Sequence, residues 1–185
     1  MKLKKFNFKT INSTNDLAIK MIKGSNNKSG IIIADKQKKG RGQYGNQWIS
    51  FKGNLFVSIF FTIDSISLTL KQMTKINCLL IKKLLSKYYK GKIEIKKPND
   101  LLINKKKISG ILQETLTKSN ENYIIVGIGI NLIKSPTIKN YPATNLFEVT
   151  NTKIDKNDVI FNLQKIYEKY IPKFSKFNTF NINRI

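Results

Sequence analysis

A glycine-rich segment between two apolar runs is the feature that most constrains how this chain can fold. The runs, residues 30–34 and 54–62, resemble buried strands, so residues 40–48 form the loop that joins them. Its glycines let backbone N–H groups approach a ligand, Arg41 can bind a carboxylate or phosphate, and Trp48 offers a flat face for a base. The segment is equally typical of a flexible surface loop, and by itself it leaves both interpretations open.

Length and composition indicate one ordinary globular domain. The chain has 185 residues, of which 41% are hydrophobic, enough to bury a core without a disulfide or a metal. No apolar run reaches the roughly 18 residues of a membrane span, and the charged residues 1–6 are not followed by the apolar stretch of a signal peptide. We therefore expect a cytoplasmic protein without a membrane partner.

Two residue types that often carry catalysis are absent or scarce. The chain has no histidine, which excludes Cys-His and Ser-His catalytic pairs and any His-ligated metal site. Its one cysteine, Cys78, stands in the apolar run 76–81. There we expect a small buried hydrophobic residue rather than a nucleophile.

The charge is strongly positive. A net charge of +23, from 34 Lys and Arg against 11 Asp and Glu, favours association with polyanions. The lysines are scattered among asparagines and isoleucines, however, and zinc-finger spacings and aromatic RNA-binding strands are missing. We interpret the charge as a solvated surface that can also attract an acidic protein partner, and we expect no specific DNA binding.

The order of the expected elements predicts an α/β (α+β) fold, with a mixed β-sheet backed by helices. A strand around residues 4–8 leads to a helix that begins at Ser13, in a capping-box pattern followed by an apolar stripe. A turn at 104–105 joins two short strands like a hairpin, which argues against a doubly wound parallel sheet. Further helices are predicted at 69–89 and 156–170, and further strands at 93–95, 101–103, 108–116 and 123–131.

Three more segments carry polar or glycine residues in suggestive patterns, and each has an ordinary structural explanation. Ser13-Thr14-Asn15 fits a helix cap, and Lys96-Lys97-Pro98-Asn99-Asp100 fits a turn. Lys107, three residues before Gly110, fits a solvated strand lysine. The glycines of Gly127-Ile128-Gly129-Ile130-Asn131 fit close packing, although they also permit a ligand to lie against the backbone.

Taken in order, these segments and the glycine-rich loop resemble the catalytic core of biotin protein ligases. That family shows an S-T-N-like start, a glutamine before a G-R-G-R-x-G loop, a K-W-P-N-D turn, a K-x-x-G strand and a G-x-G-x-N strand. The resemblance covers residues 6–172 and implies the fold shared with class II aminoacyl-tRNA synthetases and lipoate ligases. The sequence departs from the family pattern at Gln43, where an arginine is usual, and at Lys97, where a tryptophan is usual.

The resemblance implies that residues 1–185 form a single catalytic domain. Repressor-type relatives carry an N-terminal DNA-binding domain, and many relatives carry a C-terminal β-barrel. We expect neither in this chain, and hence no self-regulating transcription factor.

The resemblance also implies a reaction. Biotin and ATP, with Mg²⁺, would form biotinyl-5′-AMP, and a lysine of a biotin carboxyl carrier protein would then displace AMP, so that no enzyme nucleophile is needed. Lys107 and Arg41 would act on the reacting groups by positioning and charge. Asp100 would either help place Mg²⁺ or stabilise its turn. The implied biotin-binding residues are Ser13, Thr14, Asn15, Gln37, Arg41, Gly42, Gln43, Lys107 and Gly110, and the implied ATP or adenylate residues are Gly40, Gly45, Trp48, Asn99 and Asn131.

Two alternatives of other kinds stay open. A lipoate or octanoate ligase shares the fold and the adenylate chemistry, but the usual R-R-x-S-G-G loop and the cysteine nucleophile of the octanoyltransferases are not found in the sequence. A non-enzymatic nucleic-acid-binding domain is favoured by charge alone. The identity of the carrier and the choice between a monomer and a homodimer are left open as well.

Overall fold

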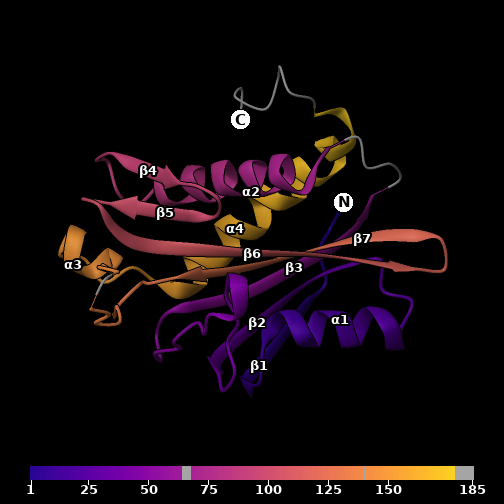
Figure 1. The fold of residues 1–185 in the computed structure, drawn as a ribbon, viewed down its shortest axis with the longest axis horizontal. Helices are drawn as coiled ribbons and strands as arrows, with labels where there is room; N and C mark the ends of the chain where they lie inside the picture. Colours follow the sequence, from indigo (N-terminus) through magenta and orange to yellow (C-terminus); the bar gives the residue numbers. More distant parts are fainter. Residues whose placement is uncertain (64–67, 140, 178–185) are drawn as a thin grey trace.

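A mixed β-sheet forms the centre of the molecule in the computed structural model, which describes residues 1–63, 68–139 and 141–177 (Figure 1). The described residues contribute seven strands in the order β1-β2-β3-β7-β6-β5-β4. β1 and β2 run parallel, as the helical crossover between them requires, and the other neighbouring pairs run antiparallel. The strands are β1 Lys5–Ile11, β2 Ser29–Gln37, β3 Leu55–Ile63, β4 Ile93–Lys96, β5 Asp100–Ile103, β6 Lys106–Lys118 and β7 Glu121–Ile130.

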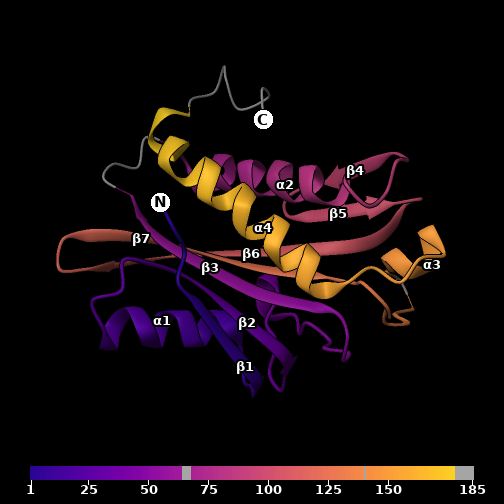
Figure 2. The same ribbon diagram turned by 180° about the vertical axis from the view of Figure 1, so that it is seen from behind.

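Helices cover both faces of this sheet (Figures 1 and 2). α1, Thr14–Gly24, lies on one face, and α2, Leu70–Leu85, lies with α4, Lys156–Tyr170, on the other. Each begins at a side-chain cap: Ser13 accepts a hydrogen bond from the Asp16 backbone, Thr69 forms a capping box with Gln72, and Asp155 caps α4. Within the described ranges, no helix has the length and apolar character needed to span a membrane.

Strand alternation separates the core into two parts. On β7, Ile124 and Val126 point into the large core beneath α2 and α4, whereas Tyr123 and Ile125 point into the small core beneath α1. Because side chains alternate, Gly127 and Gly129 continue the face that carries α1. That face therefore loses its side chains just beyond the start of α1, which leaves room for a cavity.

The expected fold class is confirmed, and so is the mixed character of the sheet. Asn104 and Lys105 both have positive φ, 50° and 61°, as a two-residue hairpin turn requires. Three short elements were not expected: α3, Leu146–Thr150, and the 3₁₀ turns η1, Gln43–Gly45, and η2, Ile171–Lys176. They are too short to show a helical period in the sequence. α2 also ends at Leu85, four residues before the expected end.

Asn54 fixes the segment that follows β7. Its side chain is fully buried, and its Oδ1 accepts hydrogen bonds from the backbone N–H groups of residues 132, 133 and 134 at 3.0, 3.0 and 3.2 Å. Its Nδ2 donates to the Lys134 carbonyl at 2.7 Å. One amide thus gives an irregular segment the hydrogen bonds that a strand would otherwise provide.

We predict that Asn54→Ala lowers the free energy of unfolding by about 2 kcal/mol, because it leaves three backbone N–H groups, of which that of Leu132 is buried, without their acceptor. Urea unfolding measures the change. Asn7→Ala, on the exposed part of β1, is the matched control and should stay within about 0.5 kcal/mol of wild type. Equal stability of the two variants would contradict the role given to Asn54.

Candidate active site

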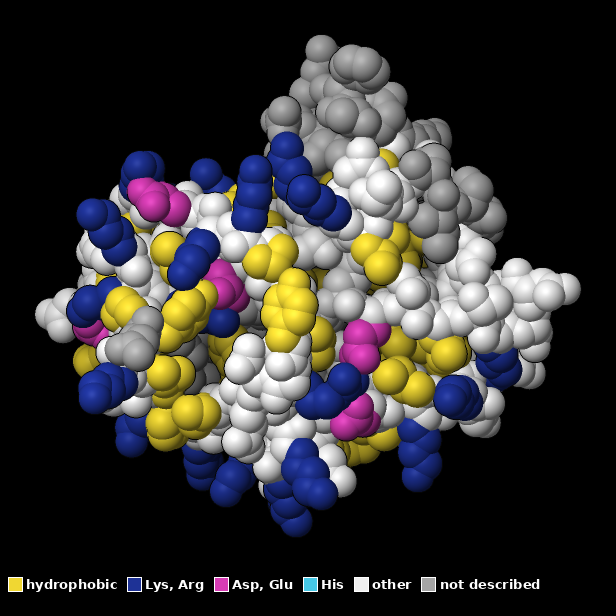
Figure 3. Space-filling view, in the orientation of Figure 1, with side chains coloured by type: hydrophobic (Ala, Val, Ile, Leu, Met, Phe, Trp, Pro, Cys, Tyr) yellow, Lys and Arg dark blue, Asp and Glu magenta, His cyan; other side chains and the backbone are white. Residues whose placement is uncertain are grey.

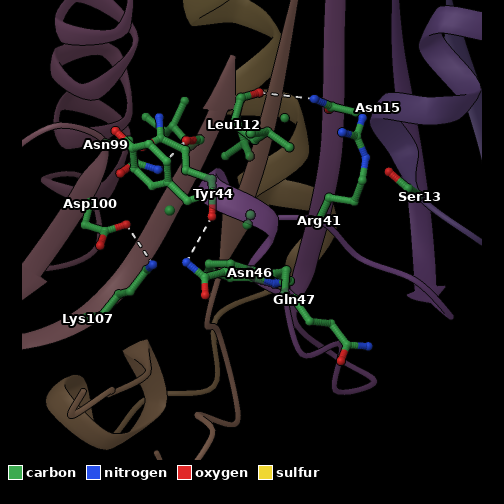
Figure 4. Close-up of a pocket in the computed structure, with 18 of the residues that line it drawn as sticks. Ser13, Asn15, Arg41, Tyr44, Asn46, Gln47, Asn99, Asp100, Lys107 and Leu112 are labelled. Atoms are coloured by element: carbon green, nitrogen blue, oxygen red, sulfur yellow. Dashed lines mark hydrogen bonds and ion pairs between the residues drawn. The ribbon is translucent and has the colours of Figure 1, made fainter. Parts of the chain in front are cut away.

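A cavity of about 460 Å³ lies on the α1 face, where four segments distant in the sequence meet (Figure 4). This volume is typical of sites for small organic ligands. Figure 4 shows Lys107 and Asp100 on one side and Arg41, Asn15 and Ser13 on the other. The structure brings together most of the residues singled out in the sequence: Ser13, Thr14, Asn15, Gln37, Arg41, Gly42, Gln43, Trp48, Asn99, Asp100, Lys107 and Gly110 all line the cavity.

The floor of the cavity is made by three glycines of β6 and β7. A Cβ atom on Gly129 would lie 2.4 Å from two atoms of the Trp48 indole, and one on Gly110 would lie 2.7 Å from the same ring. A Cβ atom on Gly127 would lie 2.4 Å from Oδ1 of Asn15. Trp48 and Asn15 therefore rest directly on the backbone of the sheet, which only glycine allows.

The glycine-rich loop is a small hairpin rather than a flexible connection. The Trp48 N–H donates to the Gly40 carbonyl at 2.9 Å, and the Gly42 N–H donates to the Asn46 carbonyl at 2.6 Å. Gly40 cannot carry a side chain, because a Cβ atom would lie 2.6 Å from the Trp48 carbonyl oxygen. At the tip, Tyr44 has a φ of 55° and a 91% exposed side chain. We call residues 40–48 the glycine hairpin.

The start of α1 supplies polar groups at one end of the cavity. Oε1 of Gln37 accepts from the Thr14 N–H at 2.8 Å and from the Thr14 hydroxyl at 3.1 Å. Gln37 therefore has its amide nitrogen to offer a ligand, and Ser13 has its hydroxyl proton. Asn15 is different, since its Nδ2 donates to the Leu112 carbonyl and to Glu114, and its Oδ1 accepts from Ser58.

A β-bulge turns Lys107 toward the cavity. Leu101 pairs with Ser109 and Leu102 pairs with Lys107, so Ile108 is the extra residue on β6. Strict alternation would place Lys107 on the same face as Ser109 and Ile111, which is the face packed by α2 and α4; the extra residue reverses it. Only the sheet pairing reveals this bulge.

The Lys107 ammonium is held by a carboxylate and two aromatic rings. Its Nζ lies 2.7 Å from Oδ1 of Asp100, 5.3 Å from the centre of the Trp48 ring and 5.2 Å from that of Tyr141. The Tyr141 hydroxyl donates to the other Asp100 oxygen. Burial, and then this bond to Asp100, raise the pKa of Tyr141, so the hydroxyl stays protonated as a donor at neutral pH.

Tyr141 is a cavity residue that the sequence analysis missed. It belongs to an irregular segment whose next residues pair with β6: the Lys107 N–H donates to the Pro142 carbonyl at 2.8 Å, and the Thr144 N–H donates to the Lys107 carbonyl at 2.9 Å. The segment has no period or motif that could have indicated this. Other lining residues outside the sequence prediction include Tyr44, Pro98, Leu112 and Ile138.

Three of the predicted residues do not line the cavity: Gly40, Gly45 and Asn131. Gly40 shapes the base of the glycine hairpin, and Gly45, with a φ of 76°, shapes its tip. Asn131 is buried, and its Nδ2 donates to the Thr144 carbonyl at 3.1 Å. In this structure Asn131 holds the segment beside Lys107 and does not face the cavity, so any effect on the adenylate would be indirect.

Asp100 does not form a resident metal site with its neighbours. In the described ranges no three His, Cys, Asp or Glu side chains gather as a metal would require. Both Asp100 oxygens are engaged, one by Lys107 and one by Tyr141. The donor set therefore does not fit a Mg²⁺ ion held by the protein alone.

Apart from Oδ1 of Asp100, which lies 2.7 Å from Nζ of Lys107, two lining side chains hold buried polar atoms that lack a hydrogen-bond partner within the described part of the chain. They are Oε1 of Gln43 and Nε1 of Trp48. A buried polar atom without a hydrogen bond costs about 1–3 kcal/mol. A ligand that donates to Gln43 and accepts from Trp48 would remove this cost.

Comparison with known proteins assigns this chain to a protein family. The family model described as the Biotin/lipoate A/B protein ligase family matches residues 7–131, and the chain belongs to this family. The bifunctional ligase/repressor BirA of Bacillus subtilis (strain 168) is 30% identical over 167 residues, which are 86% of this chain and 51% of that protein. The chain thus spans about half the length of this relative.

Solved structures of biotin protein ligases have a similar fold. The biotin protein ligase from Aquifex aeolicus in complex with biotin and ATP has a TM-score of 0.77 and 29% identity, covering 94% of this chain and 72% of that chain. The biotin protein ligase from Leishmania major in complex with biotinyl-5-AMP has a TM-score of 0.74 and 23% identity, covering 94% of this chain and 80% of that chain. At this identity the likeness supports the fold alone. The predicted resemblance to a biotin protein ligase catalytic core is confirmed.

We predict that Gly129→Ala displaces Trp48, because the new methyl group would lie 2.4 Å from the indole. Trp48 is the single tryptophan, so its fluorescence emission should shift to longer wavelength as the ring leaves the floor. Gly24→Ala is the matched control, since a Cβ atom there meets nothing within 4 Å. An unchanged emission spectrum in Gly129→Ala would show that the ring does not depend on the glycine floor.

Proposed function

We propose that this chain attaches biotin to a lysine of a biotin carboxyl carrier protein through biotinyl-5′-AMP. The observation that carries the proposal is the joint placement, around one cavity, of the α1 start, the glycine hairpin, the Lys107 strand and the glycine floor. The relatives in the family are named as biotin ligases, and one is solved with biotin and ATP. A protein that performs both half-reactions needs such a cavity, open at a rim that a carrier can reach.

The reaction suits a chain without an enzyme nucleophile. A biotin carboxylate oxygen attacks the α-phosphorus of ATP and pyrophosphate leaves with the electrons of the broken P–O bond. The carrier amine then attacks the acyl carbon, loses a proton and releases AMP. Cys78 is fully buried, and burial, with a smaller contribution from Asp100, raises its pKa to about 12, which keeps it an inert thiol.

Lys107 is the residue best placed to act on the reacting groups. Its ammonium lies inside the cavity, and an ammonium has three N–H donors, of which the ion pair with Asp100 uses only part. Negative charge that develops at the α-phosphate can therefore be stabilised there without breaking the pair. The partial enclosure of Lys107, with a 21% exposed side chain, strengthens this electrostatic effect.

The polar end of the cavity favours biotin over lipoate. A biotin head carries a ureido group that both donates and accepts hydrogen bonds, and the α1 end offers the Ser13 hydroxyl and the Gln37 amide nitrogen. A dithiolane ring would leave such groups without partners, at about 1–3 kcal/mol each. Lipoate remains the alternative ligand, to be tested in the same assay.

The charge on the face drawn in Figure 3 does not form a nucleic-acid groove. On the face shown in Figure 3, Lys and Arg side chains are scattered over the left, the lower edge and the upper middle rather than gathered in one stripe, and Asp and Glu side chains stand among them. This distribution fits a solvated basic surface that meets an acidic carrier domain.

Isotope exchange tests the proposal. The folded chain, with ATP and Mg²⁺, should exchange labelled pyrophosphate into ATP in the presence of biotin and not of lipoate, and it should then add one biotin to a purified carrier domain by mass spectrometry. Exchange that depends on lipoate instead would favour the alternative. A folded preparation that shows neither exchange nor carrier labelling would rule the function out.

We predict that Lys107→Gln slows adenylate formation by roughly 100-fold, because one charged donor to the transition state is lost. Single-turnover formation of biotinyl-5′-AMP measures it. Lys106→Gln is the matched control, since Lys106 is the preceding residue and pairs with Glu148 on the surface.

Removing Lys107 also leaves Asp100 buried without its counter-ion, which lowers stability independently of catalysis. The double variant Lys107→Gln/Asp100→Asn removes the pair as a unit and should recover stability but not activity. Recovery of both would show that Lys107 has a structural role only.

A further inference from the structure

We propose that Glu114 is a positioning residue of this site, which holds the glycine hairpin and the start of α1 against the sheet through Arg41 and Asn15. The proposal rests on the proposed function for the identity of the ligand, and on the geometry alone for the role of Glu114.

Glu114 lies on β6, on the face that forms the cavity floor. Residues 110, 112 and 114 point to the same side of the strand, because side chains alternate. Gly110 lies beneath Trp48, and the Leu112 carbonyl accepts from Asn15. Glu114 is the next position in this row, just beyond the part of the floor that the cavity exposes.

The Glu114 carboxylate collects three hydrogen bonds from two segments. Nη2 of Arg41 donates to Oε1 at 3.0 Å and to Oε2 at 2.7 Å, and Nδ2 of Asn15 donates to Oε2 at 2.7 Å. The same Nη2 atom lies 2.8 Å from Oδ1 of Asp16, in the first turn of α1. One guanidinium therefore joins the hairpin to both the strand and the helix.

This arrangement changes the role expected of Arg41. The family resemblance implies a direct contact with the substrate carboxylate or phosphate, but one of the two outer guanidinium nitrogens, Nη2, is bound by the carboxylates of Asp16 and Glu114. These carboxylates offset the positive charge that would attract an anion. Arg41 is thus placed to fix the hairpin, while Lys107 remains the cation inside the cavity.

Glu114 also sets the orientation of Asn15. Because Nδ2 is held by Glu114 and Leu112, Oδ1 faces Ser58 and the backbone at Gly127. If the carboxylate became an amide, one of its two oxygens would become a donor and would oppose Asn15 or Arg41. A single isosteric change therefore disturbs both segments.

The hairpin transmits this disturbance to Trp48. Arg41 lies between Gly40, whose carbonyl accepts from the Trp48 N–H, and Gly42. Arg41 on Glu114 and Trp48 on Gly129 are the two anchors of the hairpin on the sheet. The Arg41 side chain is 38% exposed, so the ion pair contributes little to overall stability; its effect is to keep the cavity wall in the binding position.

Trp48 quenching tests the proposal without any ligand. Trp48 is the single tryptophan, so acrylamide quenching of the free protein reports the hairpin directly. We expect Glu114→Gln to raise the quenching constant about twofold as the hairpin samples open positions. Glu121→Gln is the matched control, because it removes the same charge from an ion pair with Lys28 at the end of β7 away from the glycine floor. Its Trp48 quenching constant should equal that of the wild type. Equal quenching in both variants overturns the proposal, whether or not the chain is a ligase.

The steady-state constants KM and kcat distinguish a positioning role of Glu114 from a catalytic one. Glu114→Gln should raise the KM for biotin about tenfold and change kcat for adenylation less than about threefold, because the open hairpin reduces the binding-competent population. Glu114→Asp, which keeps the charge, should recover part of the affinity. In a double-mutant cycle with Arg41→Met, the effects should not multiply, since both variants release the same anchor.

Two kinetic results contradict the role of Glu114. Multiplying effects would mean that Arg41 contacts the ligand independently of Glu114. A fall in kcat with an unchanged KM would mean that Glu114 acts on the reaction itself. If the wild type shows no biotin turnover, the proposed function fails, and the quenching experiment still decides the role of Glu114.

Discussion

The architecture of the site depends on the direct contact between side chains and a sheet surface that has no Cβ atoms. Trp48 and Asn15 rest on Gly129, Gly110 and Gly127, at distances that exclude any other residue there. This contact has two structural consequences. It makes the backbone itself the floor of the cavity, and it gives the glycine hairpin a fixed place to lie, although the hairpin buries few side chains of its own.

The two ends of the cavity differ in how their polar groups are paired. At the α1 end, Asn15 and the Gln37 carbonyl are already hydrogen-bonded within the protein, so a ligand there meets a few remaining donors in fixed positions. At the other end, Lys107 is a charge held by Asp100 and two rings. A ligand with a neutral polar head and an anionic tail fits this asymmetry, because each part meets the kind of group that pairs with it.

The sequence predicted the fold class and most of the cavity lining because these depend on local patterns. Apolar alternation, helix caps and glycine spacing are read from neighbouring residues, and the family motifs lie in single short segments. The order of the strands and the partners across the sheet are different. Glu114 stands 73 residues from Arg41, and nothing near either one indicates their pairing. Tyr141 lies in an irregular segment, and the bulge at Ile108 appears only when β6 is paired with β5.

Some of the predicted residues bind other parts of the chain, for one physical reason. The sequence identifies residue types that can bind a ligand, but it does not show which of their hydrogen bonds the protein itself uses. Asn131, Asn15 and Arg41 all have the right chemistry, and in the structure the amides of both asparagines and Nη2 of Arg41 are engaged by other parts of the chain. The residues that can still bind a ligand are those with a buried polar atom that has no hydrogen-bond partner in the protein, such as Gln43 and Trp48. Satisfaction of buried polar groups, rather than residue type, therefore separates the groups that build this cavity from those that face its ligand.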